Sequence, residues 1–228
     1  MSAAPQIPQW LRPLAHAAKD PLAGQLTQFL VPDNAGARQS AVLMAFADDA
    51  RGPSVLLIQR ASTLRKHAGQ VAFPGGSVDD GDPTAVAAAL REAEEEVGID
   101  PASVSVVAQF PPLYIPVSGF AVTPVLAWWR DPHPVAPVDA GEVARVELVP
   151  IGELVAARNR FSVAHPSGYI GPGFAAAGLF IWGFTAVVLS GLLELGGWAV
   201  DWDPSVRRPL PAELAGRPVP PASVDLAD

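Results

Sequence analysis

The sequence predicts a mixed α/β (α+β) fold built around one hydrophobic core. Three observations predict it: half of the 228 residues are hydrophobic while 17% are charged, β-rich runs separated by turn residues recur along the chain, and one strongly amphipathic helix interrupts them. The length suits one packed domain with additions at its ends, and is short for two ordinary domains.

The β-rich runs lie on both sides of the predicted helix. Before it we expect strands at residues 40–48, 54–60 and 70–76, the last ending in a pair of glycines. After it we expect strands at residues 102–110, 120–129 and 144–150, with short helices near residues 153–158 and after Thr185. The runs differ in length and spacing, so the chain is not a repeat protein.

The two ends of the chain differ in composition from the middle. Residues 1–35 alternate prolines with Leu22, Leu26 and Leu30 at helical spacing, which predicts an N-terminal helical extension packed on the core. Residues 203–228 are rich in proline and predict a loosely held C-terminal tail. The main domain is therefore expected to span residues 36–202.

A run without charges, residues 174–193, is long enough to cross a bilayer. It contains three glycines, a threonine and a serine, and acidic rather than basic residues follow it. We therefore favour a buried strand at residues 179–184 followed by a helix from about Thr185, and keep the membrane helix as the alternative.

Charge and cysteine content exclude several kinds of site. The net charge of −8 with 15 Lys and Arg argues against a nucleic-acid partner, which needs a basic face. The absence of cysteine excludes disulfides and thiolate chemistry, so a metal would be held by oxygen or imidazole. The N-terminus does not have the pattern of a secretory signal, and we expect a cytoplasmic protein without membrane contact.

The amphipathic helix follows a glycine-rich turn. Asp82 and Pro83 predict its start, as N-cap and first helical residue, and Gly98 predicts its end. Its apolar face is predicted from residues that recur at helical spacing: Val86, Ala89, Leu90, Ala93 and Val97.

On the other side of this helix, three carboxylates converge because Glu92, Glu95 and Glu96 are spaced i, i+3 and i+4. Such a cluster is either a solvated acidic face or a cation site. The turn before it, FPGGSVDDGD, can bring backbone groups close to a metal or a phosphate. Since Mg²⁺ prefers carboxylate and phosphate oxygens, this context favours a phosphate and metal site.

At this helix the sequence resembles the Nudix family. REAEEEVGI, residues 91–99, matches the second half of the Nudix box, and Gly76 matches its leading glycine. One extra residue lies between Gly76 and Arg91, because Asp82 precedes Arg91 by nine residues where the box has a glutamate at eight. This shift, the upstream segment LLIQRASTLRKHAGQVAFPGG and the downstream segment IWGFTAVVL resemble the coenzyme A pyrophosphatase branch, with Ile58 where that branch usually has threonine.

The resemblance implies a Nudix-type α/β/α sandwich with a mixed sheet and a Mg²⁺- or Mn²⁺-dependent hydrolase. It implies that the pyrophosphate of coenzyme A or a derivative is cleaved to 3′,5′-ADP and 4′-phosphopantetheine. The metal ligands that it implies are Glu92, Glu95 and Glu96, with the Gly76 carbonyl as a further ligand, while Arg91 orients the glutamates. The general base is left open between Glu95 and Glu142.

The basic segment before the box supplies the expected substrate contacts. Arg60, Arg65 and Lys66 are candidates for the substrate phosphates, or else are solvated or paired with Asp79 and Asp80. The upstream segment that resembles the coenzyme A branch also implies that Phe73 and Gly75 lie at the substrate. The alternatives are another Nudix substrate, namely ADP-ribose, a nucleotide sugar or a nucleoside triphosphate, or a non-catalytic nucleotide-binding module. The expected partner is a small-molecule substrate, and a homodimer is left open.

Overall fold

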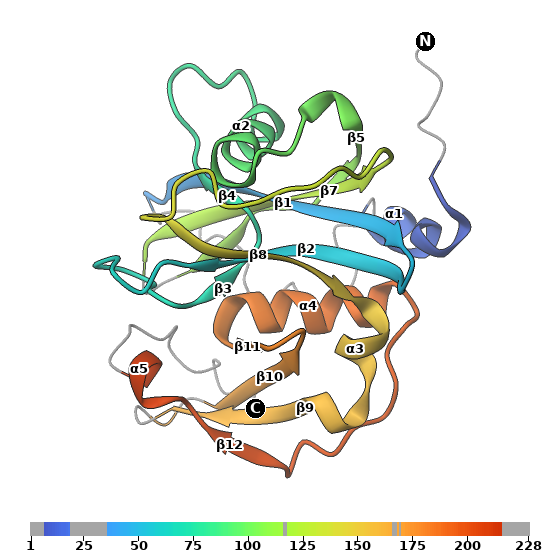
Figure 1. Cartoon of the computed structure of the whole chain (residues 1–228), viewed down its shortest axis with the longest axis vertical. Helices are drawn as coiled ribbons and strands as arrows, with labels where there is room; N and C mark the ends of the chain where they lie inside the picture. Colours follow the sequence, from blue (N-terminus) through green and yellow to red (C-terminus); the bar gives the residue numbers. More distant parts are fainter. Residues whose placement is uncertain (1–6, 19–35, 116–117, 166–167, 169, 216–228) are drawn as a thin grey trace.

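The computed structural model describes residues 7–18, 36–115, 118–165, 168 and 170–215. In these residues the elements form layers: helix α2 covers one face of a large sheet, helix α4 covers its other face, and a second sheet lies beyond α4 (Figure 1). The predicted α+β class, with a mixed sheet between helices, is confirmed. The second sheet was not predicted.

The large sheet, sheet A, contains eight strands of the described residues. Five follow the order β3-β2-β1-β7-β5, while β4 pairs with β1, β6 with β7 and β8 with β2. The β1 and β7 pair is parallel and the other pairs are antiparallel, so the sheet is mixed. The strands span Arg38–Asp49 (β1), Gly52–Arg60 (β2), Val71–Ala72 (β3), Gly75–Ser77 (β4), Val104–Gln109 (β5), Leu113–Ile115 (β6), Phe120–Trp129 (β7) and Val143–Pro150 (β8).

The glycine-rich segment differs from the single strand expected at residues 70–76. It forms two short strands, because β3 pairs with β2 whereas β4 crosses to pair with β1. The crossing brings Gly75 very close to the backbone of β1, where a Cβ would overlap the carbonyl of Ala41. Only glycine fits at this crossing, which delivers the following turn to the end of α2 that carries the glutamates.

Helix α2, Ala85–Val97, packs its small apolar face on sheet A. Ala89, Ala93 and Val97 are fully buried, and Gly98 ends the helix in the left-handed conformation with φ 71°, as predicted. The predicted start is wrong: the N-cap is Thr84, whose hydroxyl accepts a hydrogen bond from the N–H of Ala87 at 3.1 Å. Asp82 lies outside the helix because its carboxylate pairs with Arg91 instead.

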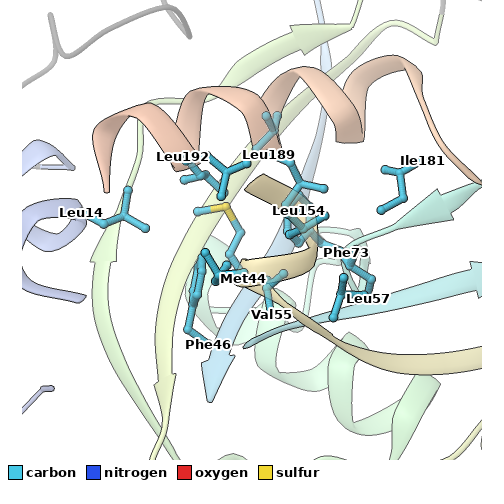
Figure 2. Close-up of a cluster of buried hydrophobic side chains, with 14 of the residues drawn as sticks. Leu14, Met44, Phe46, Val55, Leu57, Phe73, Leu154, Ile181, Leu189 and Leu192 are labelled. Atoms are coloured by element: carbon cyan, nitrogen blue, oxygen red, sulfur yellow. The ribbon is translucent and has the colours of Figure 1, made fainter. Parts of the chain in front are cut away.

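Helix α4, Gly183–Leu195, covers the opposite face of sheet A. Leu189 and Leu192 of this helix lie over Met44, Val55 and other side chains of the sheet (Figure 2). The run at residues 174–193 therefore divides into the end of β10, strand β11 and α4. The predicted strand and helix are both present, but the strand ends at Ile181 rather than at residue 184, and the helix begins at Gly183. Within the described residues, we find no helix whose length and apolar character would let it cross a membrane.

The second sheet, sheet B, has the order β11-β10-β9-β12. Its last strand corrects the prediction of a loosely held tail: β12 pairs in parallel with β9, and Leu210 and Leu214 are buried beside it. The tail residues 216–228 and the residues Leu22, Leu26 and Leu30, predicted to be helical, lie outside the described residues. The strands are Arg160–Ala164 (β9), Ile170–Ala176 (β10), Leu179–Ile181 (β11) and Arg207–Pro209 (β12).

The remaining helices are short. Helix α1, Arg12–Ala17, follows a 3₁₀ turn and packs Leu14 against α4, so the described part of the N-terminal extension contacts the core. Helix α3, Ile151–Val155, corresponds to the short helix expected near residues 153–158, and α5 spans Ala212–Ala215. The division of the chain at residues 35 and 202 stays a prediction.

Candidate active site

The carboxylates of α2 lie where the turn after β4 meets the helix. The side chain of Glu92 is 19% exposed and packs directly on the backbone of Gly76, so closely that a Cβ at this position would overlap the carboxylate. A larger residue at position 76 would therefore displace the Glu92 carboxylate. The structure brings this predicted pair together and places a carboxylate beside the backbone of the turn.

Glu96 is the most buried carboxylate of the site. Its side chain is 6% exposed, its Oε2 accepts a hydrogen bond from the N–H of Gly75 at 2.9 Å, and its Oε1 lies 3.6 Å from Nη1 of Arg60. Burial raises the pKa of Glu96 to about 7, although the Gly75 N–H and the charge of Arg60 lower it. The expectation that Glu96 points away from the sheet is thus wrong. The N–H of Gly75, a residue expected at the substrate, instead donates a hydrogen bond to Glu96.

Glu95 and Glu92 both accept a hydrogen bond from the guanidinium of Arg91. Nη1 of Arg91 donates to Oε2 of Glu95 at 2.9 Å and to Oε1 of Glu92 at 3.2 Å. Glu95 is 59% exposed, whereas burial raises the pKa of the Glu92 carboxyl above its ordinary value against the opposing effect of Arg91. Glu94 is exposed on the far side of the helix. Arg91 therefore orients two of the three carboxylates, as expected.

Arg91 also fastens the preceding loop to the helix. It donates to both carboxylate oxygens of Asp82, at 2.9 and 3.1 Å, and to the carbonyl of Ser77 at 3.1 Å. Hydrogen bonding to Asp82, foremost, raises the pKa of the guanidinium, and the same bond lowers the pKa of Asp82. Sequence reasoning missed this role of Asp82, although its separation of nine residues from Arg91 was visible.

Glu142 approaches the site from a different element. It is exposed in the turn before β8, and its carbonyl accepts a hydrogen bond from the N–H of Ala61, the residue after Arg60. Its negative charge contributes to the raised pKa of Glu96, so the two carboxylates interact through space. The second candidate for the general base is therefore close to the α2 carboxylates.

The predicted substrate contacts separate into different environments. Arg60 pairs with Glu96 rather than with Asp79 or Asp80, and Arg65 and Lys66 are exposed in the loop after β2 without an ion pair to a described residue. The side chain of Phe73 is 3% exposed within the core, among the residues of Figure 2. The substrate contact expected of Phe73 is corrected to a packing role beneath the glycine-rich turn.

The donor set fits a hard divalent cation. Its polar atoms are carboxylate and backbone oxygens, which such cations prefer as ligands. Burial raises the pKa of two of the carboxylates, Glu92 and Glu96, so a bound cation would offset the cost of burying their negative charges. In the described part of the chain, no three Asp, Glu or His side chains already converge on one metal position. Here the arginines and the Gly75 N–H take up the oxygens that a cation would bind.

The chain is similar to known proteins of one family. A family model described as the NUDIX domain matches residues 37–167. An uncharacterized Nudix hydrolase, NudL, of Citrobacter koseri is 42% identical over 167 residues, which cover 70% of this chain and 83% of that protein. NudL of Escherichia coli K12, also called uncharacterized, is 57% identical over 89 residues, covering 39% of this chain and 45% of that protein.

Among solved structures, a Nudix hydrolase from M. smegmatis, RenU, has a TM-score of 0.52 at 20% sequence identity. The match covers 73% of this chain and 90% of that chain. At this identity the likeness supports the fold.

Proposed function

Because the chain belongs to the Nudix hydrolase family, we propose that it hydrolyses the pyrophosphate bond of coenzyme A or a derivative, giving 3′,5′-ADP and 4′-phosphopantetheine. Nudix hydrolases act on small nucleotide derivatives and generally require a divalent cation. The choice of coenzyme A rests on the extra residue between Gly76 and Arg91 and on the two segments that resemble the coenzyme A branch, at residues 56–76 and 181–189.

The observation that carries this proposal is the ion pair between Arg60 and Glu96 at 3.6 Å. Arg60 belongs to the upstream segment and Glu96 to the box, so the two segments meet at one place. The downstream segment joins them, because the hydroxyl of Thr185 donates to the carbonyl of Val71 at 2.9 Å. Three sequence features that are separate along the chain thus converge in space, as parts of one substrate site would.

Glu92, Glu95 and Glu96, with the carbonyl of Gly76, are the residues that would hold Mg²⁺ or Mn²⁺. The cation would supply positive charge to the pyrophosphate oxygens and lower the pKa of a bound water. Arg91 keeps Glu92 and Glu95 in position, and Arg60 offers its guanidinium to a phosphate. An acidic site without such cations would repel a substrate of the same charge.

For the general base we propose Glu95, which is exposed and within reach of solvent on the face that carries the other carboxylates. Glu142 is the competing candidate, since its charge acts on Glu96. The two assignments separate in the variants Glu95→Gln and Glu142→Gln. The variant of the true base loses the acidic limb of the pH profile of kcat, while the other variant keeps it.

The test of the function is a substrate panel in Mg²⁺ and in Mn²⁺ with products identified by mass. The panel holds coenzyme A, an acyl-coenzyme A, ADP-ribose, a nucleotide sugar and a nucleoside triphosphate, and Glu96→Gln controls for contaminating hydrolases. We expect coenzyme A or its thioester to give 3′,5′-ADP. Turnover of another panel member without any turnover of the coenzyme A compounds would refute the proposal, and no turnover of any member would favour a binding module.

A further inference from the structure

A cavity of about 200 Å³ lies next to the carboxylates, between the start of α4, strand β3 and the end of β6. Arg60 lines it together with His67, Val71, Ile115, Trp182 and Phe184. Because Nη1 of Arg60 also lies 3.6 Å from Glu96, the cavity opens from the place where the substrate phosphates are proposed to bind. A group bonded to one of those phosphates would extend into it.

The lining combines one charged side chain with several apolar ones. Among the described lining residues, Arg60 is the sole lysine or arginine, and the ring of His67 is hydrogen-bonded to Gln70 at 2.9 Å. Val71, Ile115 and the rings of Trp182 and Phe184 supply apolar surface. A ligand that fits is therefore anionic at one end and mostly apolar beyond it.

Polar side chains also line the cavity: Gln70, Ser118 and Thr185, beside His67. The hydroxyls of Ser118 and Thr185 donate to backbone carbonyls, so they can still accept a hydrogen bond from a ligand. The ligand that fits can therefore carry a hydrogen-bond donor beside its apolar group.

We propose that the cavity binds the branched part of the pantetheine arm that is bonded directly to the phosphate. This part carries two methyl groups on one carbon, then a hydroxyl and an amide, which match the apolar walls and the polar side chains among them. The inference rests on the proposed function and deepens it, because it names the arm of the substrate and the residues that select it.

The other arm of the substrate matches the cavity less well. The adenosine arm of coenzyme A carries an additional 3′-phosphate, which would need a cation of its own inside the cavity. The ribose of ADP-ribose or the sugar of a nucleotide sugar presents several hydroxyls and no branched apolar group, so it would not cover the apolar side chains of Val71, Ile115 and Phe184. The lining therefore favours a branched apolar group over a sugar next to the phosphate.

The test uses the two products as probes of the two arms, in Mg²⁺ and by calorimetry, since neither product has a pyrophosphate to cleave. Ile115 lies on the same face of β6 as the core residue Leu113, so Ile115→Trp fills the cavity, whereas Tyr114→Trp changes the opposite face and is the matched control. We expect Ile115→Trp to weaken 4′-phosphopantetheine about tenfold or more and to leave 3′,5′-ADP unchanged.

With the intact enzyme's substrates, Ile115→Trp should raise KM equally for coenzyme A and dephospho-coenzyme A, since the 3′-phosphate lies outside the cavity.

The outcomes separate this proposal from the function it rests on. Weakening of 3′,5′-ADP but not of 4′-phosphopantetheine assigns the cavity to the nucleotide and overturns the inference, as does equal weakening of both or of neither. If the intact protein fails to cleave coenzyme A yet binds 4′-phosphopantetheine in a manner sensitive to Ile115→Trp, the proposed reaction falls and the cavity assignment stands. Thermal unfolding of each variant identifies a loss of binding that comes from misfolding.

Discussion

Arg91 holds Asp82 by two parallel hydrogen bonds, from Nε to Oδ1 at 3.1 Å and from Nη2 to Oδ2 at 2.9 Å. The Asp82 side chain is 7% exposed in this contact. This pair holds the loop before α2 against the helix. Asp82 is also the carboxylate closest in sequence to the position of the first glutamate of the Nudix box. The extra residue between Gly76 and Arg91 thus lies in a loop that the Asp82–Arg91 pair, the brace of this loop, holds against α2. Asp82 is therefore not a further carboxylate of the cation site.

Asp82→Asn tests the brace. The asparagine keeps an acceptor but loses the charge, so Arg91 is held less firmly and Glu92 and Glu95 with it. We expect kcat/KM to fall by about tenfold, a loss of about 1.4 kcal/mol in transition-state stabilisation. Asp80→Asn, an exposed neighbour, is the control and should be close to the parent. A loss as large as that of Glu96→Gln would make Asp82 a metal ligand instead.

The carboxylates themselves are tested by three isosteric variants on one helix. Glu95→Gln and Glu96→Gln should each lower kcat by at least about a hundredfold, because each removes a charge from the cation site. Glu94→Gln, on the exposed side of the same helix, should leave kcat within about twofold. Circular dichroism and Mn²⁺ binding by electron paramagnetic resonance separate lost metal from lost fold. Normal Mn²⁺ affinity in both active-site variants would contradict the ligand assignment.

Gly76→Ala tests the close approach of the turn to Glu92. The added Cβ would overlap the Glu92 carboxylate, so either the turn or the side chain must move. We expect activity to drop by about a hundredfold, since small displacements of positioned groups have effects of this order. The control is Gly81→Ala, whose Cβ would meet nothing within 4 Å. Full activity of Gly76→Ala would show that Glu92 need not lie against the turn.

The buried Glu96 predicts a pH-dependent stability in EDTA. Its pKa is raised from 4.5 to about 7 in the folded protein, chiefly by burial, so between these pH values the folded state binds more protons than the unfolded state. Stability therefore decreases as the pH rises through this window, by up to about 3 kcal/mol. Urea unfolding of the protein and of Glu96→Gln checks it: the variant should lack this decrease. An equal decrease in both would assign it to other groups.

The sequence predicted those parts of the molecule that depend on local patterns. Helix α2 has the predicted apolar face and ends at the predicted Gly98, because periodicity and capping act within a few residues. The start was misplaced by two residues because Asp82 had a stronger partner in Arg91 than the helix N-terminus. That competition involves a contact over nine residues, which a local capping rule does not contain.

The parts that could not be predicted depend on distant pairings. The burial of Glu96 beside Gly75 and Arg60 depends on how β2, β4 and α2 meet. Helical spacing alone predicts that this side chain points away from the sheet. Likewise, β12 consists of only three residues, and all three are exposed. This short segment becomes a strand because it pairs with the edge of β9 that β10 leaves free. The cavity requires residues of three separate segments and has no local pattern of its own.

The hydrogen bond from Thr185 to the carbonyl of Val71 spans 114 residues of the chain. During synthesis, the segment that contains Arg60 and Val71 leaves the ribosome long before the segment that begins α4. The wall formed by Trp182 and Phe184 can close only after the segment that begins α4 has emerged. A nascent chain stopped before residue 182 would therefore carry the acidic helix without the cavity.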